Sequence, residues 1–369
     1  MSLTRFGVGY CAVLVVALFT TVAVAADYSS SLRAGKVDLE SAGAMSFGPD
    51  GILFIGDSVG AAVFAIDTQD RTPGSSPALV NVKGINEKVA AMLGTAADQI
   101  LINDLAVNPI SKKAYLSVSR GRGPDTIPVI LRVDPSGKIE QFSLDNVKHA
   151  KVSLPNAPDA QTKDRRGRSL RLEAITDLAF VEGSLIVAGL SNEEFASKLR
   201  SIPFPFKEAD QGSSVEIFHG SHGRFETRSP VRTFVPYEIK AEPHVLAAYT
   251  CTPLVKFPLS NLKPGTKVVG TTIAELGNRN RPLDMIVYQK GGQDFILMSN
   301  SSRGVMKLST QKIETYGGIT ERTDITGLPY ETIEHLKGVQ QLDQLDESNA
   351  LILVRSDSGS LDLQTVAFP

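Results

Sequence analysis

Residues 47–58 read FGPDGILFIGDS, and the pattern that they begin recurs along the chain. A turn at residues 48–51 leads into an apolar strand at 52–55, and a small polar loop then leads into a second apolar strand. Short apolar runs bounded by Gly, Asp, Asn and Pro are typical of strands joined by turns. The stretch therefore predicts a β-hairpin, and its repetition predicts a fold made of similar hairpins.

The strand–loop–strand unit recurs five more times. The later copies begin near residues 114, 185, 245, 295 and 351. A further apolar strand headed by Asp precedes three of the units, at residues 104–107, 177–180 and 284–287, with weaker relatives at 44–47 and 341–344. Each module thus spans roughly 57 residues, which suits a four-stranded blade with its loops.

These modules predict an all-β fold, a β-propeller of six blades, with seven blades as the alternative. One blade cannot bury both of its faces, so the blades must stack in a ring. We expect a strand near residues 36–39 to close the ring by pairing with the last blade. A β-sandwich is the rival fold, but it would not predict the repeated Asp. Helical patterns are confined to residues 85–93, which Gly94 would cap, and residues 192–199.

The first 25 residues have the pattern of a secretory signal peptide. Arg5 precedes an uncharged, mostly apolar stretch that ends in Ala-Val-Ala at residues 23–25. We expect cleavage after Ala25, which leaves residues 26–369 as a single propeller domain that is exported to the periplasm or secreted. An uncleaved membrane anchor is the alternative. We predict no other membrane span.

Charge and cysteine content limit the possible partners and cross-links. The chain has 38 basic and 40 acidic residues, so it has no overall attraction for nucleic acid. After cleavage Cys251 is the sole cysteine, which rules out an intramolecular disulfide. We expect a monomer whose partner is a small molecule or a protein.

Residues 47–58 and the Asp-headed strand at 177–180 resemble the repeat of NHL-type and SMP-30/gluconolactonase-like propellers. The resemblance touches all six modules, and it implies a fold superfamily rather than an activity. Some SMP-30-like propellers hold a metal in the channel and hydrolyse lactones or esters. The resemblance therefore adds a metal-dependent hydrolase to the possible functions.

The repeated aspartates are the main candidates for a metal site. In a propeller the first strand of each blade lines the central channel, so these side chains would face one axis, where converging carboxylates favour calcium or another divalent cation. The alternative is that each Asp caps a turn or accepts hydrogen bonds from backbone amides. The candidate metal ligands are Asp104, Asp177, Asp284, Asn103 and Glu242, and the candidate catalytic groups are His244 and Glu242.

Two other segments carry possible metal ligands. The segment 242–251 contains His244 and Cys251, which would suit copper or a reactive thiol, although a lone Cys near a strand end is usually a small buried residue. His219 and His222, three residues apart, could also hold a metal, but the surrounding sequence favours an exposed hairpin turn.

One loop-rich face is the candidate binding surface. The basic run at 163–171, with Arg120 and Arg122, would form an anion-binding lip, unless it is only a solvated loop. Residues 191–206 predict a long loop that serves as an apolar lid or contact surface. The predicted rim residues are Asp57, Arg120, Asn192, Cys251, Asn300, Arg303 and Asp357.

Three functions follow from the sequence. The first is a binding or scaffold propeller that engages a small ligand or protein on its loop-rich face. The second is a calcium-type lactonase or esterase with a channel metal. The third is a redox or copper protein that uses His244 and Cys251. The chain lacks a P-loop and a CxxCH haem motif, which excludes the enzyme classes built on them. A GxSxG match, GDSVG at residues 56–60, lies in the loop between two predicted strands, whereas a nucleophile elbow joins a strand to a helix.

Overall fold

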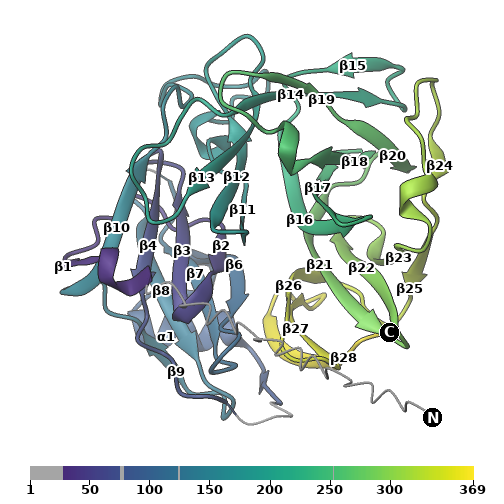
Figure 1. Ribbon diagram of the computed structural model, residues 1–369. Coiled ribbons are helices and arrows are strands. Elements are labelled where there is room, and N and C mark those ends of the chain that lie inside the picture. The colour runs from purple at the N-terminus through teal and green to yellow at the C-terminus, as the bar shows by residue number, and fades with distance from the viewer. Residues whose placement is uncertain (1–27, 75–78, 124, 252) are drawn as a thin grey trace, which may run out of the picture.

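The computed structural model is a six-bladed β-propeller (Figure 1). It describes residues 28–74, 79–123, 125–251 and 253–369. The predicted signal peptide and its cleavage site lie outside these residues. No helix within the described residues is long and apolar enough to cross a membrane.

The first two blades each begin with an inner strand at the central channel and continue outward through antiparallel partners. Blade one consists of β2 (Met45–Phe47), β3 (Ile52–Asp57), β4 (Ala62–Asp67), β10 (Val147–Ser153) and β1 (Arg33–Gly35). Blade two consists of β6 (Ile100–Val107), β7 (Ala114–Arg120), β8 (Ile127–Val133) and β9 (Ile139–Gln141).

Blades three and four are extended at their outer edges. Blade three consists of β11 (Asp177–Val181), β12 (Ser184–Leu190), β13 (Ser197–Pro203), β14 (Ser213–His219), β15 (Arg224–Glu226) and β19 (Lys267–Val269). Blade four consists of β16 (Val231–Ile239), β17 (Glu242–Tyr249), β18 (Pro253–Pro258), β20 (Thr271–Leu276) and β24 (Ile325–Gly327).

Blades five and six have four strands each. Blade five consists of β21 (Pro282–Lys290), β22 (Gln293–Asn300), β23 (Gly304–Ser309) and β25 (Tyr330–Ile333). Blade six consists of β26 (Val339–Gln344), β27 (Asn349–Arg355), β28 (Leu361–Ala367) and β5 (Asn81–Val82).

Helical structure is short. The α-helix α1 (Ile85–Leu93) ends at Gly94, whose left-handed backbone has φ 65°, so the predicted helix and its cap are confirmed. The 3-10 helices are η1 (Tyr28–Ser31), η2 (Pro49–Gly51), η3 (Ala97–Gln99), η4 (Arg171–Glu173), η5 (Leu259–Asn261) and η6 (Ile313–Thr315). The helix predicted at 192–199 is wrong, because Ser197–Pro203 forms β13 and pairs with β12.

The blades do not follow chain order around the ring. The inner strands contact one another in the order β6, β2, β11, β16, β21 and β26, and β26 contacts β6 again. Blade one therefore lies between blades two and three. After β4 the chain adds β5 to blade six, builds blade two, and returns through β10 to the outer part of blade one.

Strand exchange closes the ring. The strand that completes blade six is β5, which pairs with β28 through Val82–Leu363 and Asn81–Gln364. The prediction that residues 36–39 close the ring is wrong. Val37 instead packs with blade-one residues, and its N–H donates to the Leu144 carbonyl. The closing strand has only two residues, but Val80 and Val82 are buried among core residues of blades two and six.

Val82→Asp tests this closure. The Val82 side chain is 2% exposed, so the change removes apolar burial and places a charge in the core. We expect the free energy of unfolding to fall by about 3 kcal/mol or more in urea titrations. The control is Leu79→Asp, because Leu79 is 67% exposed and its change should cost less than about 0.5 kcal/mol. Equal stability of the two variants would contradict the assignment of β5 as the closing strand.

Candidate functional site

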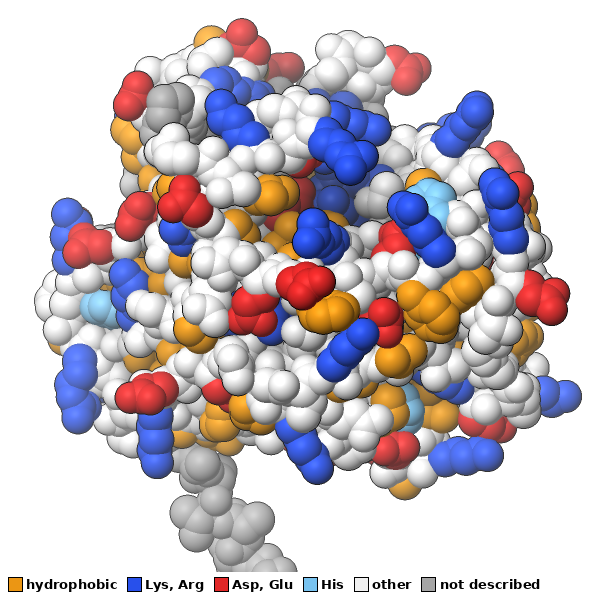
Figure 2. Space-filling view, turned by 90° about the horizontal axis from the view of Figure 1, so that it is seen from above, with side chains coloured by type: hydrophobic (Ala, Val, Ile, Leu, Met, Phe, Trp, Pro, Cys, Tyr) orange, Lys and Arg blue, Asp and Glu red, His pale blue; other side chains and the backbone are white. Residues whose placement is uncertain are grey.

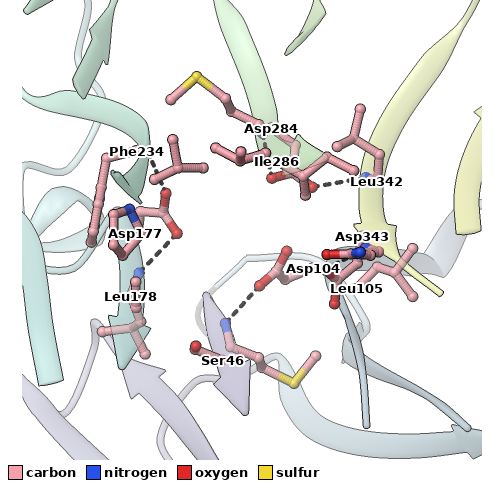
Figure 3. Close-up of a pocket in the computed structure, with 17 residues that line it drawn as sticks. Ser46, Asp104, Leu105, Asp177, Leu178, Phe234, Asp284, Ile286, Leu342 and Asp343 are labelled. Atoms are coloured by element: carbon pink, nitrogen blue, oxygen red, sulfur yellow. Dashed lines mark hydrogen bonds between the residues drawn. The ribbon is translucent and has the colours of Figure 1, made fainter. Parts of the chain in front are cut away.

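Four aspartates from four inner strands face one cavity in the central channel. Asp104, Asp177, Asp284 and Asp343 all line this cavity, which has a volume of about 250 Å³ (Figure 3). The first three are the predicted channel residues. Asp343 was not predicted, because it lies two residues after the position that aligns with the other three.

Each carboxylate joins two neighbouring blades. In Asp177, Oδ1 accepts a hydrogen bond from the Leu178 N–H at 2.8 Å, and Oδ2 accepts one from the Phe234 N–H of blade four at 2.7 Å. In Asp284, the same two oxygens accept from Met285 at 2.7 Å and from Leu342 of blade six at 2.8 Å.

The other two aspartates repeat this arrangement. Asp343 accepts from its neighbour Gln344 at 2.7 Å and from the Val107 N–H of blade two at 2.6 Å. Asp104 accepts from the Met45 N–H of blade one at 2.6 Å. The structure thus shows the backbone-amide arrangement that we weighed as the alternative to metal binding. We call these four residues the aspartate belt.

The four aspartates of the belt have raised pKa values. Burial raises the pKa of Asp177 to about 7 and that of Asp343 to about 6, although hydrogen bonds from backbone amides oppose the change. Burial, followed by the charge of Asp177, raises the pKa of Asp104 well above its usual range. Burial and the charge of Asp104 do the same for Asp284.

The other two predicted channel ligands, Asn103 and Glu242, lie outside the belt. Asn103 lies beside the belt and donates from Nδ2 to the Ala42 carbonyl and to Ser119 Oγ. Glu242 lies on β17, the second strand of blade four, where it accepts a hydrogen bond from Ser260 and is half-exposed. Glu242 is not among the residues that line the channel cavity. Calcium binding at the belt remains a prediction.

His244 and Cys251 do not come together. Both belong to the β17 region, but His244 is paired with Tyr237 and Pro258 near one end of β17, and Cys251 follows the other end. Five residues of strand carry the chain roughly 17 Å from His244 to Tyr249, before the turn that holds Cys251. The predicted copper or redox pair is therefore wrong in its geometry.

The loops that carry the predicted rim residues lie on one face, which we call the upper face. It carries the connections between the second and third strands of all six blades, after β3, β7, β12, β17, β22 and β27. Asn192 and Asp357 are exposed there, and Arg120 and Arg303 are half-buried. Asp57 is fully buried, where it accepts hydrogen bonds from the backbone of Glu40, Ser41 and Gly60. Asn300 is buried against Asn280.

Residues 191–206 are not a lid. The middle of this segment is β13, and the aromatic residues that follow it pack inward. Phe204 packs against Phe54 and Phe180, with ring centroids 5.0 and 6.5 Å apart. The apolar segment therefore joins the core of blades one and three.

A second cavity, of about 230 Å³, opens where the inner strands begin, on the upper-face side of the belt. Arg232, Arg281 and Arg355 line it together with Asn103, Thr176, Gln340 and Gln341. We call this cavity the arginine mouth. The space-filling view shows Lys and Arg side chains around a hollow in the upper part of the picture (Figure 2).

Positive charge dominates the arginine mouth. Arg232 forms an ion pair with Glu173 at 2.6 Å. Within the described residues Arg281 and Arg355 form no ion pair, and both are exposed to solvent. Burial lowers the pKa of Arg232, Glu173 opposes this, and the charges of Arg281 and Arg168 lower it further. Arg168, from the predicted basic run, is thus close enough to add to the positive field.

Comparisons with known proteins assign no family to this chain. No family model and no curated protein matches the chain. Solved structures align with the chain only at low identity and with TM-scores below 0.5, so they carry no argument about its fold or function. A glucose dehydrogenase has 13% identity and a TM-score of 0.38, covering 91% of this chain and 100% of its own. The PQQ-bound aldose sugar dehydrogenase of Streptomyces coelicolor has 10% identity and a TM-score of 0.32, covering 91% and 96%.

A third similar structure is the β-propeller domain of Cps50 (Swd1) from Myceliophthora thermophila. It has 11% identity and a TM-score of 0.36, covering 89% of this chain and 84% of its own. No activity or cofactor follows from similarities at this level.

From the raised pKa values of the belt we predict that the free energy of unfolding depends on pH. The folded-state pKa of Asp177 is about 7, above the unfolded value of about 3.9, so its protonated form stabilises the fold below pH 4 and that contribution is lost as the pH rises through 7. Because channel solvent still reaches part of the side chain, we expect the loss to be roughly 1–2 kcal/mol between pH 5 and 8.

Urea unfolding at several pH values checks this prediction. In Asp177→Asn the decline between pH 5 and 8 should be smaller than in the natural chain, because the titrating group is gone. Asp357→Asn, at an exposed residue, should keep the natural slope. Parallel curves for Asp177→Asn and the natural chain would show that Asp177 titrates normally.

Proposed function

We propose that this chain is an exported binding protein that takes a small anionic ligand, carrying carboxylate or phosphate groups, in the arginine mouth. One observation carries the proposal: three guanidinium groups line one cavity, and among the residues that the structure describes only Arg232 has a carboxylate partner. The planar guanidinium group forms paired hydrogen bonds to carboxylate and phosphate oxygens. The apolar N-terminal stretch supports export.

The remaining lining supports recognition of a polar molecule. Asn103, Gln340 and Gln341 bring neutral amide groups to the cavity. Gln341 is already oriented, since its Nε2 donates to the Asn103 carbonyl at 3.0 Å. A few fixed polar groups around a concave site are typical of small-molecule binding.

The lining also favours binding over catalysis. Among the residues that line the mouth there is no His, Cys, Asp, Glu or Lys, so none supplies a general base with an ordinary pKa near neutrality. The carboxylate of Glu173 is held by Arg232. An anion in this cavity would therefore be held without an adjacent group to attack it.

A metal-dependent hydrolase is the second candidate. It is favoured by the position of the belt, because Asn103 and Thr176 line the mouth and the next residues, Asp104 and Asp177, line the channel cavity. A calcium ion at the belt could then polarise a carbonyl group of a ligand in the mouth. Elemental analysis before and after chelation, followed by a lactone and ester screen, tests this candidate.

Calorimetric titration with citrate and inorganic phosphate tests the binding proposal. We expect one of these anions to bind, and we expect Arg281→Gln and Arg355→Gln to weaken binding about 10- to 100-fold, the effect of losing a charge-assisted hydrogen bond. Raising the salt concentration should weaken binding as well.

The matched control is Arg33→Gln, which removes the same charge from an exposed position on β1, at the outer edge of blade one. It should bind as the natural chain does. If neither anion binds, or if Arg281→Gln and Arg33→Gln bind equally, the arginine mouth is not an anion site.

A further inference from the structure

Two loops on neighbouring blades bring three metal-binding side chains together. His219 ends β14 and His222 lies in the turn to β15, whereas Cys251 lies in the connection between β17 and β18. The ligand atoms of these three side chains all lie within 4.8 Å of one another. We propose that His219, His222 and Cys251 form a binding site for a thiophilic transition-metal ion, zinc or copper.

Glu226 determines which imidazole atoms face the ion. Its Oε2 lies 3.0 Å from Nδ1 of His219, and its Oε1 lies 2.6 Å from Nδ1 of His222. The two rings lie against each other at a tilt of 37°, with centroids 3.9 Å apart. Because both Nδ1 atoms are bonded to one carboxylate, both Nε2 atoms lie on the ring edges away from Glu226.

The Nε2 atom of His219 is the observation that points most directly to a metal. Within the part of the chain that the structure describes, it is buried without a hydrogen-bond partner, and the residue is only 2% exposed. A buried polar atom without a partner costs free energy that a bound ion would recover. In the tautomer that donates from Nδ1 to Glu226, the lone pair of Nε2 is the one that would bind a metal.

Glu226 is the outer-shell carboxylate that metal-bound histidines commonly have. Its Oε2 also accepts a hydrogen bond from the Ser229 Oγ, which holds the carboxylate in place beside both rings.

The turn itself is held in a fixed shape. Glu275 of β20 accepts a hydrogen bond from the Gly220 N–H at 2.6 Å. A Cβ at Gly220 would lie 2.8 Å from Cγ of Glu275, so the close approach requires glycine there. The two histidines are thus presented by a braced turn between β14 and β15.

Cys251 completes the set from blade four. Its N–H donates to the Asn280 carbonyl at 2.8 Å, which fixes the loop beside the segment before β21 that holds Arg281. It is half-buried and forms no disulfide. The site therefore adjoins the arginine mouth but uses different residues.

The donor set selects the class of metal. Two imidazole nitrogens and one thiolate suit zinc and copper, whereas calcium prefers oxygen ligands. Three protein ligands leave a fourth position, and His222 is exposed at the surface, so solvent can reach it. This inference does not depend on anion binding.

The test is metal binding by the full mature chain after chelation. We expect about one equivalent of zinc by elemental analysis after dialysis against zinc, or one equivalent of copper after exposure to Cu²⁺. Cobalt replaces zinc for absorption spectroscopy. Both Co²⁺ and Cu²⁺ should give a thiolate-to-metal charge-transfer band when they bind.

Variants assign the ligands. Cys251→Ser should abolish the charge-transfer band, and His222→Ala, at an exposed residue that should not disturb folding, should weaken binding about 100-fold. Glu226→Gln should weaken binding roughly 10- to 100-fold by misorienting the rings. His335→Ala, an exposed histidine elsewhere, is the matched control and should bind normally.

Two results would overturn the proposal. One is that the natural chain binds neither zinc, cobalt nor copper after chelation. The other is that His222→Ala and Cys251→Ser bind as tightly as His335→Ala. Either result would leave the two histidines as ion-pair partners of Glu226 only.

Discussion

The carboxylate–amide bridge between neighbouring inner strands is the interaction on which the rest of this propeller depends. Inner strands pair only outward, within their own blades, so their channel-facing N–H groups need other acceptors. A carboxylate has two oxygens, and each belt aspartate uses one for its own strand and one for the next blade. The bridges run in one direction around the ring, from blade six to two, two to one, three to four and five to six.

This arrangement separates the carboxyl groups of the belt, which join the blades, from the arginines of the mouth, which line the proposed binding site. The belt gathers four carboxyl groups in a confined space, where burial raises their pKa values. The arginines lie at the mouth above them, mostly without ion pairs. Carboxylates that are occupied by backbone amides do not neutralise the mouth by direct contact, so the guanidinium groups remain available to an anion from solvent.

The sequence predicts the features that come from local periodicity. The six modules, the channel aspartates and the helix at residues 85–93 all follow from patterns within a short window, and the structure confirms the fold and the helix. Asp343 does not fit the repeat, because it lies two residues after position 341, which aligns with the other three aspartates. Strand alternation nevertheless places Asp343 on the same face of the strand as position 341.

Features that depend on distant segments were not predictable in this way. The closing strand β5 has two residues, too few for a periodic signal. The order of blades around the ring depends on where the chain goes after β4, which no local pattern records. His219 and His222 look like part of an exposed turn in sequence, and only the tertiary structure places Cys251 of another blade beside them.

Amide hydrogen exchange at Met45, Val107, Phe234 and Leu342, in the presence of a chelator, tests the role of the belt most directly. These are the amides that donate across blade junctions. If the aspartates are structural, the four amides exchange only through global unfolding, and added calcium leaves them unchanged. If they exchange rapidly in chelator and calcium slows them, the carboxylates serve an ion instead, and the account given for the channel is wrong.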